Sequence, residues 1–343
     1  MMKTMVLNAP GDMKVIDQEI DQSFSKMGLL RVISSGICAA DSYLWSGNHP
    51  WDIKYPIVPG HEIFGEVIEI DKNLSTKFPL GTKVTAQVNV ACYECELCLA
   101  KKFNMCTKKR HFGSTYMGSF AEQIALPFGS RLHAYTDFID DQIGGLSETM
   151  ANAIYCVDKV GLDGSETILI LGMGSIGACL THYLDATFQN LDLTVLTSSI
   201  EKRELLESRG IKAISLNELE SKEDCFDVIF ETSGFKDNFR YGLSSLKPTG
   251  KAMIYGVFQE KMLFDFNIVS EFKELTLVGG HLANDEAFEK STKFLAKHQE
   301  DLNYLISNVV GFSNFTSAFT SPNFSKFKTI FQPNFESEFS NGF

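Results

Sequence analysis

The stretch TILILGMGSIG, residues 167–177, sets the interpretation of the rest of the chain. Its first five residues are apolar and largely β-branched, which predicts a short buried strand, and the residues after the glycines favour a helix. The glycine spacing G-x-G-x-x-G permits a tight turn, close approach of the backbone to a pyrophosphate and close strand–helix packing. Such turns also occur without a ligand, but between a strand and a helix we expect a dinucleotide, with its phosphates at the helix N-terminus. The cradle would consist of Gly172, Gly174, Ser175, Ile176 and Gly177.

Composition and charge narrow the class of protein. The chain has 343 residues, of which 44% are hydrophobic and 22% charged, as expected for about two globular domains. A net charge of −12 argues against nucleic-acid or membrane-surface binding, which needs a basic face. The sequence contains no run of 18 apolar residues, so we expect no membrane-spanning helix. Pro10-Gly11 interrupts the N-terminal residues before a signal-peptide core could form. We therefore expect a cytoplasmic protein whose eight cysteines are thiols or metal ligands.

The first half of the chain reads as β-rich. Short apolar runs alternate with glycine and proline turns, which predicts a small barrel or sandwich. The expected strands cover residues 5–7, 14–16, 29–34, 63–70 and 81–85.

A cysteine-rich lobe follows these strands. Its spacing C-x2-C-x2-C-x7-C suits a tetrahedral zinc site that is structural, because four thiolates leave no open position. The lobe is polar, so a metal would have to hold it in shape. The alternatives are an iron–sulfur cluster, whose usual spacing differs, and a pair of disulfides. The four residues are Cys92, Cys95, Cys98 and Cys106.

A second group of potential ligands lies in two loops that each adjoin a predicted strand. Cys38 stands in the sequence SGICAAD, and His61 and Glu62 stand in PGHE. A thiolate, an imidazole and a carboxylate suit a zinc ion that keeps one position for water or substrate. From these residues alone, a buried cysteine and an ordinary His-Glu pair are the favoured interpretation.

Taken together, these motifs resemble the zinc-containing medium-chain dehydrogenase/reductase family, in its polyol, threonine and glucose dehydrogenase branch. The resemblance rests on the Cys38 and His61-Glu62 loops, the cysteine lobe, the glycine-rich turn and the sequence KELTLVG at residues 273–279. It implies an α/β fold with a GroES-like catalytic domain at residues 1–150 and a Rossmann coenzyme domain at 151–282. Residues 283–343 would return to the catalytic domain. The resemblance also implies a homo-oligomer, either a dimer or a tetramer.

The resemblance assigns roles to individual residues. It implies that Cys38, His61 and Glu62 are catalytic zinc ligands and that the remaining ligand position falls on Glu148. Asp41 would orient the ligand histidine.

Two positions depart from the family pattern. Members often carry Ser or Thr two residues after the ligand cysteine and His three residues later, and these residues relay the alcohol proton to solvent. This chain has Ala40 and Tyr43 there, and a tyrosine with a pKa near 10 is a poor base. The proton would therefore leave through Glu62, Glu148 or water.

The second half of the chain alternates strands and helices, which predicts a parallel doubly wound sheet. After its strand at residues 191–196 an NAD enzyme usually carries an acid that binds the ribose 2′-hydroxyl. The expected position falls near Ser198, so we favour NADP over NAD, with Glu201 as a possible acid in another alignment. The 2′-phosphate would bind Ser198, Ser199, Lys202 and Arg203, and Thr232 follows a further strand at the coenzyme edge.

The sequence thus predicts a zinc-dependent oxidoreductase that transfers a hydride between NADP(H) and a secondary alcohol or ketone, as in a polyol or sugar. One alternative is a sugar-phosphate reductase resembling ribulose-5-phosphate reductases, suggested by Ala40 and by the basic run KKRH at residues 108–111. For that run we favour a solvated basic surface in an acidic protein. A second alternative is a non-catalytic nucleotide-binding relative that has lost the proton relay.

Overall fold

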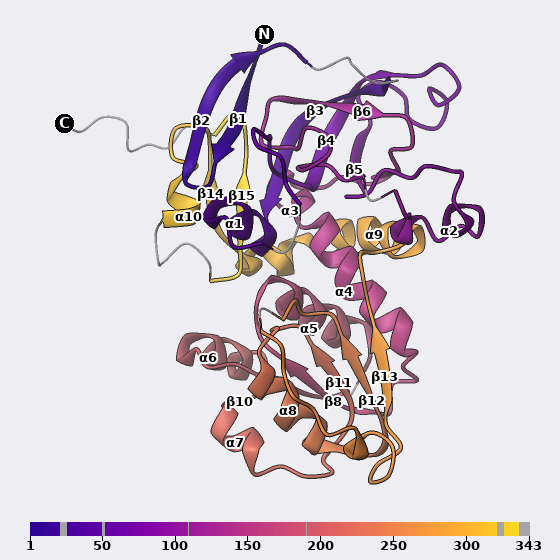
Figure 1. Ribbon diagram of the computed structural model, residues 1–343, viewed down its shortest axis with the longest axis vertical. Helices are drawn as coiled ribbons and strands as arrows, with labels where there is room; N and C mark the ends of the chain where they lie inside the picture. The colour runs from indigo at the N-terminus through magenta and orange to yellow at the C-terminus, as the bar shows by residue number, and fades with distance from the viewer. Residues whose placement is uncertain are drawn as a thin grey trace, which may run out of the picture. The chain divides into compact units, whose positions relative to one another are not determined.

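The computed structural model describes residues 1–20, 26–49, 52–108, 110–189, 191–258, 260–320 and 326–335. The chain forms two compact units, one of Met1–Ala151 with Leu282–Phe343 and one of Asn152–His281 (Figure 1). The division falls within α4 (Ser147–Val160). In the part of the chain that the structure describes, no helix is long and apolar enough to cross a membrane.

The first unit is rich in strands, as the sequence predicts, and most of its paired strands run antiparallel. A hairpin of β1 (Met2–Ala9) and β2 (Asp12–Gln18) accompanies a seven-stranded sheet. That sheet has the order β14-β15-β3-β4-β5-β7, with β6 paired to β3. Its strands are β3 (Lys26–Ile37), β4 (Glu62–Ile70), β5 (Lys83–Ala86), β6 (Gln123–Pro127), β7 (Leu132–Ala134), β14 (Ile306–Val310) and β15 (Lys328–Phe331).

Short helices and one long helix complete this unit. They are α1 (Ala39–Ser46), α2 (Glu96–Leu99), η1 (Phe103–Met105), α3 (Asp141–Gly144), α9 (Asp285–Leu302), η3 (Asn303–Leu305) and α10 (Ser317–Thr320). The long helix α9 begins at the N-cap Asn284, whose side chain accepts a hydrogen bond from the Ala287 amide.

Phenylalanines among the described C-terminal residues pack into the first unit. Phe315 and Phe331 lie edge-on to the ring of Phe120, at centroid distances of 4.7 and 5.6 Å. Strand β15 pairs antiparallel with β3, and Thr329 lies opposite Ile37. Residues that are far apart in sequence thus meet beside the end of β3.

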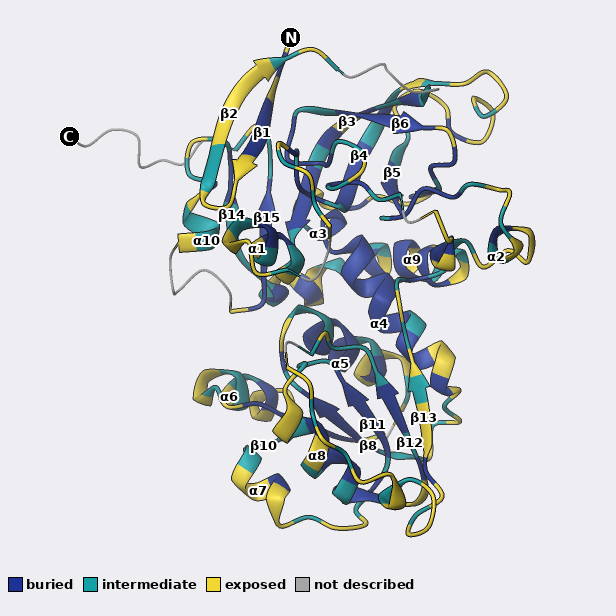
Figure 2. Ribbon diagram, viewed as in Figure 1, coloured by how far each residue is buried: buried dark blue, intermediate teal, exposed yellow. Residues whose placement is uncertain are grey.

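The second unit is a parallel sheet of order β10-β9-β8-β11-β12-β13, which confirms the predicted Rossmann architecture. The interiors of its central strands are buried (Figure 2). The strands are β8 (Thr167–Leu171), β9 (Asp192–Leu196), β10 (Lys212–Ile214), β11 (Phe226–Glu231), β12 (Leu246–Ile254) and β13 (Thr276–Gly279). The helices are α5 (Ser175–Thr187), α6 (Ile200–Ser208), α7 (Leu216–Glu220), α8 (Lys236–Ser245) and η2 (Phe266–Ile268).

Candidate active site and metal centres

Cys38 lies where β3 ends and α1 begins. It is the N-cap of α1, and its amide donates a 2.8 Å hydrogen bond to Oδ2 of Asp41, the third residue of that helix. An acidic side chain at this position satisfies an amide that the helix leaves without a partner. The sequence Cys38-x-x-Asp41 therefore fixes the direction in which the thiol leaves the helix end.

His61 is brought to Cys38 by strand pairing. It precedes β4, and Glu62, the first residue of β4, lies opposite Gly36 of β3. Each of Cys38, His61 and Glu62 offers one ligand atom, and these atoms lie within 4.8 Å of one another. Two loops about twenty residues apart thus place a thiol, an imidazole and a carboxylate around one point.

The buried carboxylate of Asp41 joins the two loops. Its Oδ1 accepts a 3.3 Å hydrogen bond from the Gly60 amide and lies 3.7 Å from Nδ1 of His61. Burial raises the pKa of Asp41, an effect that His61 partly opposes. Burial alone would lower the pKa of His61, but the charges of Asp41 and Cys38 raise it well above its ordinary value. The negative potential of the site favours a cation beside the imidazole, which is what a bound metal would supply.

Glu62 has a partner that the sequence analysis missed. Both carboxylate oxygens lie within hydrogen-bond distance of the Lys328 ammonium, at 2.6 and 2.7 Å, and both side chains are buried. The Thr149 hydroxyl donates a third bond, of 3.0 Å, to Oε2. Burial lowers the pKa of Lys328, but the Glu62 carboxylate more than offsets this and the pKa is raised. A lysine inside the otherwise apolar run FKTIF was the available signal, because a buried lysine needs an anionic partner.

Glu148 lies in the first turn of α4, in the same unit as this group. It is 5% exposed, and its charge acts on both His61 and Lys328. The preceding Ser147 bonds to the Tyr135 hydroxyl at 2.7 Å, which anchors the start of the helix. Glu148 is not among the three residues whose ligand atoms lie within 4.8 Å of one another, so the structure links it to this group through its charge.

Ala40 and Tyr43 lie on α1 and are both partly buried. The hydrogen bonds among the described residues do not link the Tyr43 hydroxyl to Cys38 or Glu62. The structure thus offers no protein group at these two positions that connects the site to solvent through the part of the chain it describes.

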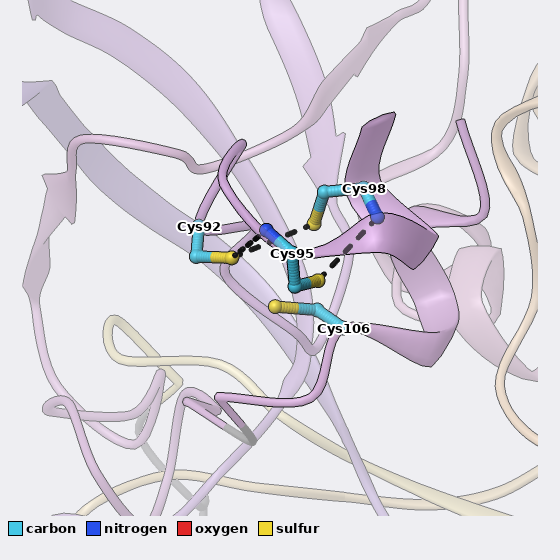
Figure 3. Close-up of side chains that lie close together, drawn as sticks. All are labelled: Cys92, Cys95, Cys98 and Cys106. Carbon is cyan, nitrogen blue, oxygen red and sulfur yellow. Dashed lines mark hydrogen bonds between the residues drawn. The ribbon is translucent and has the colours of Figure 1, made fainter. Parts of the chain in front are cut away.

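The cysteine lobe has the geometry of a closed metal site (Figure 3). The sulfur atoms of Cys92, Cys95, Cys98 and Cys106 point toward one another, lie within 4.8 Å and belong to free cysteines. Cys92 Sγ and Cys98 Sγ are 3.8 Å apart, which matches the edge of about 3.8 Å of a tetrahedron with zinc–sulfur bonds of about 2.3 Å. The donor set therefore fits zinc.

Backbone amides support negative charge on this lobe. The amides of Glu94 and Cys95 both donate to Cys92 Sγ at 3.4 Å, and the pKa of Cys92 is lowered as a result. Hydrogen bonds from the Thr107 and Cys98 amides lower the pKa of Cys95 to about 5. Burial raises the pKa of Cys98 to about 12, so this thiol needs a metal cation to become a thiolate.

The glycine-rich turn joins β8 to α5 in the second unit. Gly172 has a φ of +105°, which an L side chain rarely adopts. A Cβ on Gly177 would lie 2.0 Å from the Gly172 carbonyl oxygen, so glycine is required for this close approach. The N-cap of α5 is Gly174, which has no side chain that could cap the helix. A helix N-terminus favours an anion.

The residues that the sequence predicts to bind the 2′-phosphate of the coenzyme lie just after β9. Ser199 caps α6 by accepting a bond from the Lys202 amide, and Ser198 is exposed. The Lys202 ammonium donates a 2.8 Å bond to the Met173 carbonyl within the glycine-rich turn. Arg203 is half-buried, and its Nε has no hydrogen-bond partner among the described residues.

One residue of the basic run at 108–111 forms hydrogen bonds beside the cysteine lobe. Arg110 donates bonds to the Tyr116 hydroxyl at 3.3 Å and to the Ala91 carbonyl at 3.2 Å. Lys108 is exposed, and Lys109 lies outside the described residues.

Comparison with known proteins places the chain in a family. The alcohol dehydrogenase GroES-like domain matches residues 26–135, and the glucose dehydrogenase C-terminus matches residues 152–332. The chain belongs to the zinc-containing medium-chain dehydrogenase/reductase family, and it is an enzyme of the alcohol and polyol dehydrogenase type.

Individual relatives agree with this assignment. An erythritol/L-threitol dehydrogenase from Mycolicibacterium smegmatis is 25% identical, with 82% of this chain and 83% of that protein covered. An L-threonine 3-dehydrogenase from Rhizobium johnstonii is 30% identical, with 85% and 86% covered. A zinc-binding dehydrogenase from Sinorhizobium meliloti, solved with NADP bound, has a TM-score of 0.87 at 23% identity, with 97% and 99% covered.

Proposed function

We propose that this enzyme uses zinc and NADP(H) to interconvert a secondary alcohol and its ketone, with a polyol or sugar as substrate. The observation that carries the proposal is the convergence of Cys38, His61 and Glu62 within 4.8 Å, in a family of dehydrogenases. Erythritol, L-threitol and L-threonine, for which the two relatives are named, all carry a hydroxyl on a secondary carbon.

The protein groups divide into ligands and groups that position the ligands. We assign Cys38, His61 and Glu62 as the residues that hold the catalytic zinc, with Glu148 as the remaining ligand position. Glu62 already accepts bonds from Lys328 and Thr149, so its oxygens are only partly free. When bound, zinc would act as a Lewis acid that lowers the pKa of the substrate hydroxyl.

Asp41 and Lys328 set the geometry and charge of this site. Asp41 holds the Cys38 and Gly60 amides and faces Nδ1 of His61, which directs the other ring nitrogen to a metal. Ionised Cys38, Glu62 and Glu148 would present three negative charges to the metal. Lys328 neutralises the charge of Glu62, which leaves a net negative charge of two. Glu62 and Glu148 also remain the candidates for accepting the alcohol proton.

NADP is the proposed coenzyme, and its nicotinamide would accept the hydride. The support is the absence of an acid directly after β9, the hydroxyls of Ser198 and Ser199 and the adjacent Lys202 and Arg203. The pyrophosphate would lie at the start of α5, and Thr232 forms part of the same edge.

A sugar-phosphate substrate is less well supported. Arg110, the best anion ligand in the basic run, already binds the Tyr116 hydroxyl and the Ala91 carbonyl. A phosphorylated ketose that reacts much faster than the free ketose would favour this alternative over the leading proposal.

The proposal is tested by turnover of polyols, sugars and their ketones with NADP⁺ or NADPH. We expect Cys38→Ala and His61→Ala to abolish turnover while coenzyme binding persists, because coenzyme and metal bind through different residues. Cys225→Ala is the matched control, since Cys225 is a half-buried free thiol outside both cysteine groups. Coenzyme binding by the wild type without turnover of any alcohol or carbonyl would favour the non-catalytic alternative.

A further inference from the structure

A buried carboxylate at the end of β11 has no role in the chemistry described above. Glu231 is fully buried, and it forms no ion pair with any of the residues described. Burying a carboxylate without a cation is costly unless hydrogen bonds compensate for the lost hydration. A fold that keeps such a group uses its hydrogen bonds for something specific.

Three hydrogen bonds to Oε1 serve one loop, whereas Oε2 is buried without a hydrogen-bond partner among the described residues. Oε1 of Glu231 accepts bonds from the Ser233 amide at 2.8 Å, the Ser233 hydroxyl at 2.6 Å and the Gly234 amide at 2.8 Å. Gly234 has a φ of +69°. The single oxygen therefore fixes the backbone of residues 232–234 in a tight turn.

That turn forms one wall of the glycine-rich cradle. A Cβ on Gly172 would lie 2.8 Å from Cβ of Ser233, so Ser233 packs directly on the first glycine. The Thr232 hydroxyl donates a 3.1 Å hydrogen bond to the Leu171 carbonyl oxygen. A Cβ on Gly177 would lie 3.0 Å from the Thr232 hydroxyl oxygen. Residues 232 and 233 thus hold the backbone of the turn that is proposed to carry the pyrophosphate.

The chain after β12 closes the other side. A Cβ on Gly256 would lie 2.3 Å from Oε2 of Glu231 and 2.5 Å from the Gly234 amide nitrogen. The carboxylate is therefore enclosed by two loops at the carboxyl edge of the sheet, where dinucleotides bind in this architecture.

We propose that Glu231 is a positioning residue for coenzyme binding: by holding residues 232–234 it keeps the Gly172 turn in the shape that accepts a dinucleotide pyrophosphate. This inference rests on the proposed coenzyme site. It predicts an equal loss for NADPH and NADH, because the pyrophosphate is common to both.

The test measures the dissociation constants of both coenzymes by fluorescence titration of folded protein. We expect Glu231→Leu to weaken both by at least about tenfold, and Glu231→Gln to weaken them less, because the amide keeps an accepting oxygen. If Glu231→Leu does not fold, Ser233→Ala serves as the test, because it removes one of the three donors to Oε1. We expect it to weaken the binding of both coenzymes by about threefold or more.

The matched control is Glu166→Leu. Glu166 also accepts two loop amides, from Asp163 and Gly164 at 2.9 Å each, but it lies at the amino end of β8. We expect it to lower thermal stability and leave both dissociation constants unchanged. Folded Glu231→Leu that binds coenzyme within about twofold of the wild type, or an equal loss in Glu166→Leu, would overturn the inference. A wild type that binds neither coenzyme would instead refute the proposed function.

Discussion

At the scale of single residues, the pair of Lys328 and Glu62 is the most consequential feature of the candidate site. Their side chains are 3% and 1% exposed, so neither charge is solvated by water. Removing one member of a buried ion pair leaves the other charge buried without a partner, which lowers the free energy of unfolding. Removing both members lowers it far less. The pair therefore links the stability of the first unit to the charge beside the proposed metal.

We expect Lys328→Met to lower the free energy of unfolding by about 3 kcal/mol, because it leaves Glu62 buried without a cation. The double variant Lys328→Met with Glu62→Gln should recover most of the loss. Lys26→Met is the control, since Lys26 pairs with the exposed Glu69, and it should cost less than about 1 kcal/mol. Urea denaturation measures all three. Equal losses in Lys328→Met and Lys26→Met would show that the buried pair does not carry this energy.

Coenzyme choice is also decided by single side chains. We expect Ser198→Asp to shift the ratio of NADP to NAD affinities toward NAD by at least about tenfold, because the carboxylate repels the 2′-phosphate and accepts a bond from the free hydroxyl. Ser208→Asp adds the same charge on an exposed serine at the far end of α6 and should leave the ratio unchanged. An unchanged ratio in Ser198→Asp would place the 2′ end of the coenzyme elsewhere.

Sequence reasoning found the three residues that the structure brings together but not the residue that pairs with one of them. Cys38, His61 and Glu62 stand in short motifs that keep their meaning without any knowledge of the fold. Lys328 follows Glu62 by 266 residues and reaches it only because β15 pairs with β3. Such a contact depends on topology, which no local pattern encodes.

At the scale of elements, we propose that the cysteine lobe depends on a bound metal more than on packing. Its buried cluster contains little beyond Ala91, Cys98 and Cys106, with Phe103 packed against it. So small a cluster cannot compensate for the entropy of ordering the lobe.

We expect Cys98→Ser to remove the structural metal and open the lobe, so that protease cleaves within residues 92–106. Cys225→Ser changes a thiol outside the lobe and should leave the cleavage pattern as in the wild type. Limited proteolysis followed by mass spectrometry of the fragments measures both. An intact lobe in metal-free Cys98→Ser would mean that packing alone holds it.

Strand β8 and the glycine-rich turn were predicted correctly because their signals are local. The run TILIL becomes β8 and the spacing of Gly172, Gly174 and Gly177 becomes the turn to α5. Helix α4 was not predicted, although Glu148 in its first turn was assigned through the family resemblance. Residues 147–150 are all buried, so the start of the helix has little of the polar alternation that marks a surface helix.

At the scale of the whole molecule, pH acts on stability through His133. Burial lowers the pKa of this histidine to about 4, even though Asp285 opposes the shift, while Arg131 and Lys77 add to it. The unfolded chain takes up this proton near pH 6.5, whereas the folded chain resists it until about pH 4. The folded state therefore loses stability as pH falls through this interval.

We expect His133→Gln to flatten the decline of unfolding free energy between about pH 6.5 and pH 4.5, by up to about 2 kcal/mol. The comparison is of slopes, because the substitution also removes the stacking of His133 on Phe288 and lowers stability at neutral pH. Urea denaturation at several pH values gives both slopes. Parallel slopes for the variant and the wild type would show that other groups cause the acid sensitivity.

The central claim is that two different metal sites exist in one chain, one closed by four cysteines and one built on Cys38 and His61. Elemental analysis of purified wild type, Cys38→Ala and Cys225→Ala tests it most directly. We expect two zinc ions per chain in the wild type and in Cys225→Ala, and one in Cys38→Ala. One zinc ion per chain in all three proteins would contradict the claim, because the Cys38 site would then hold no metal.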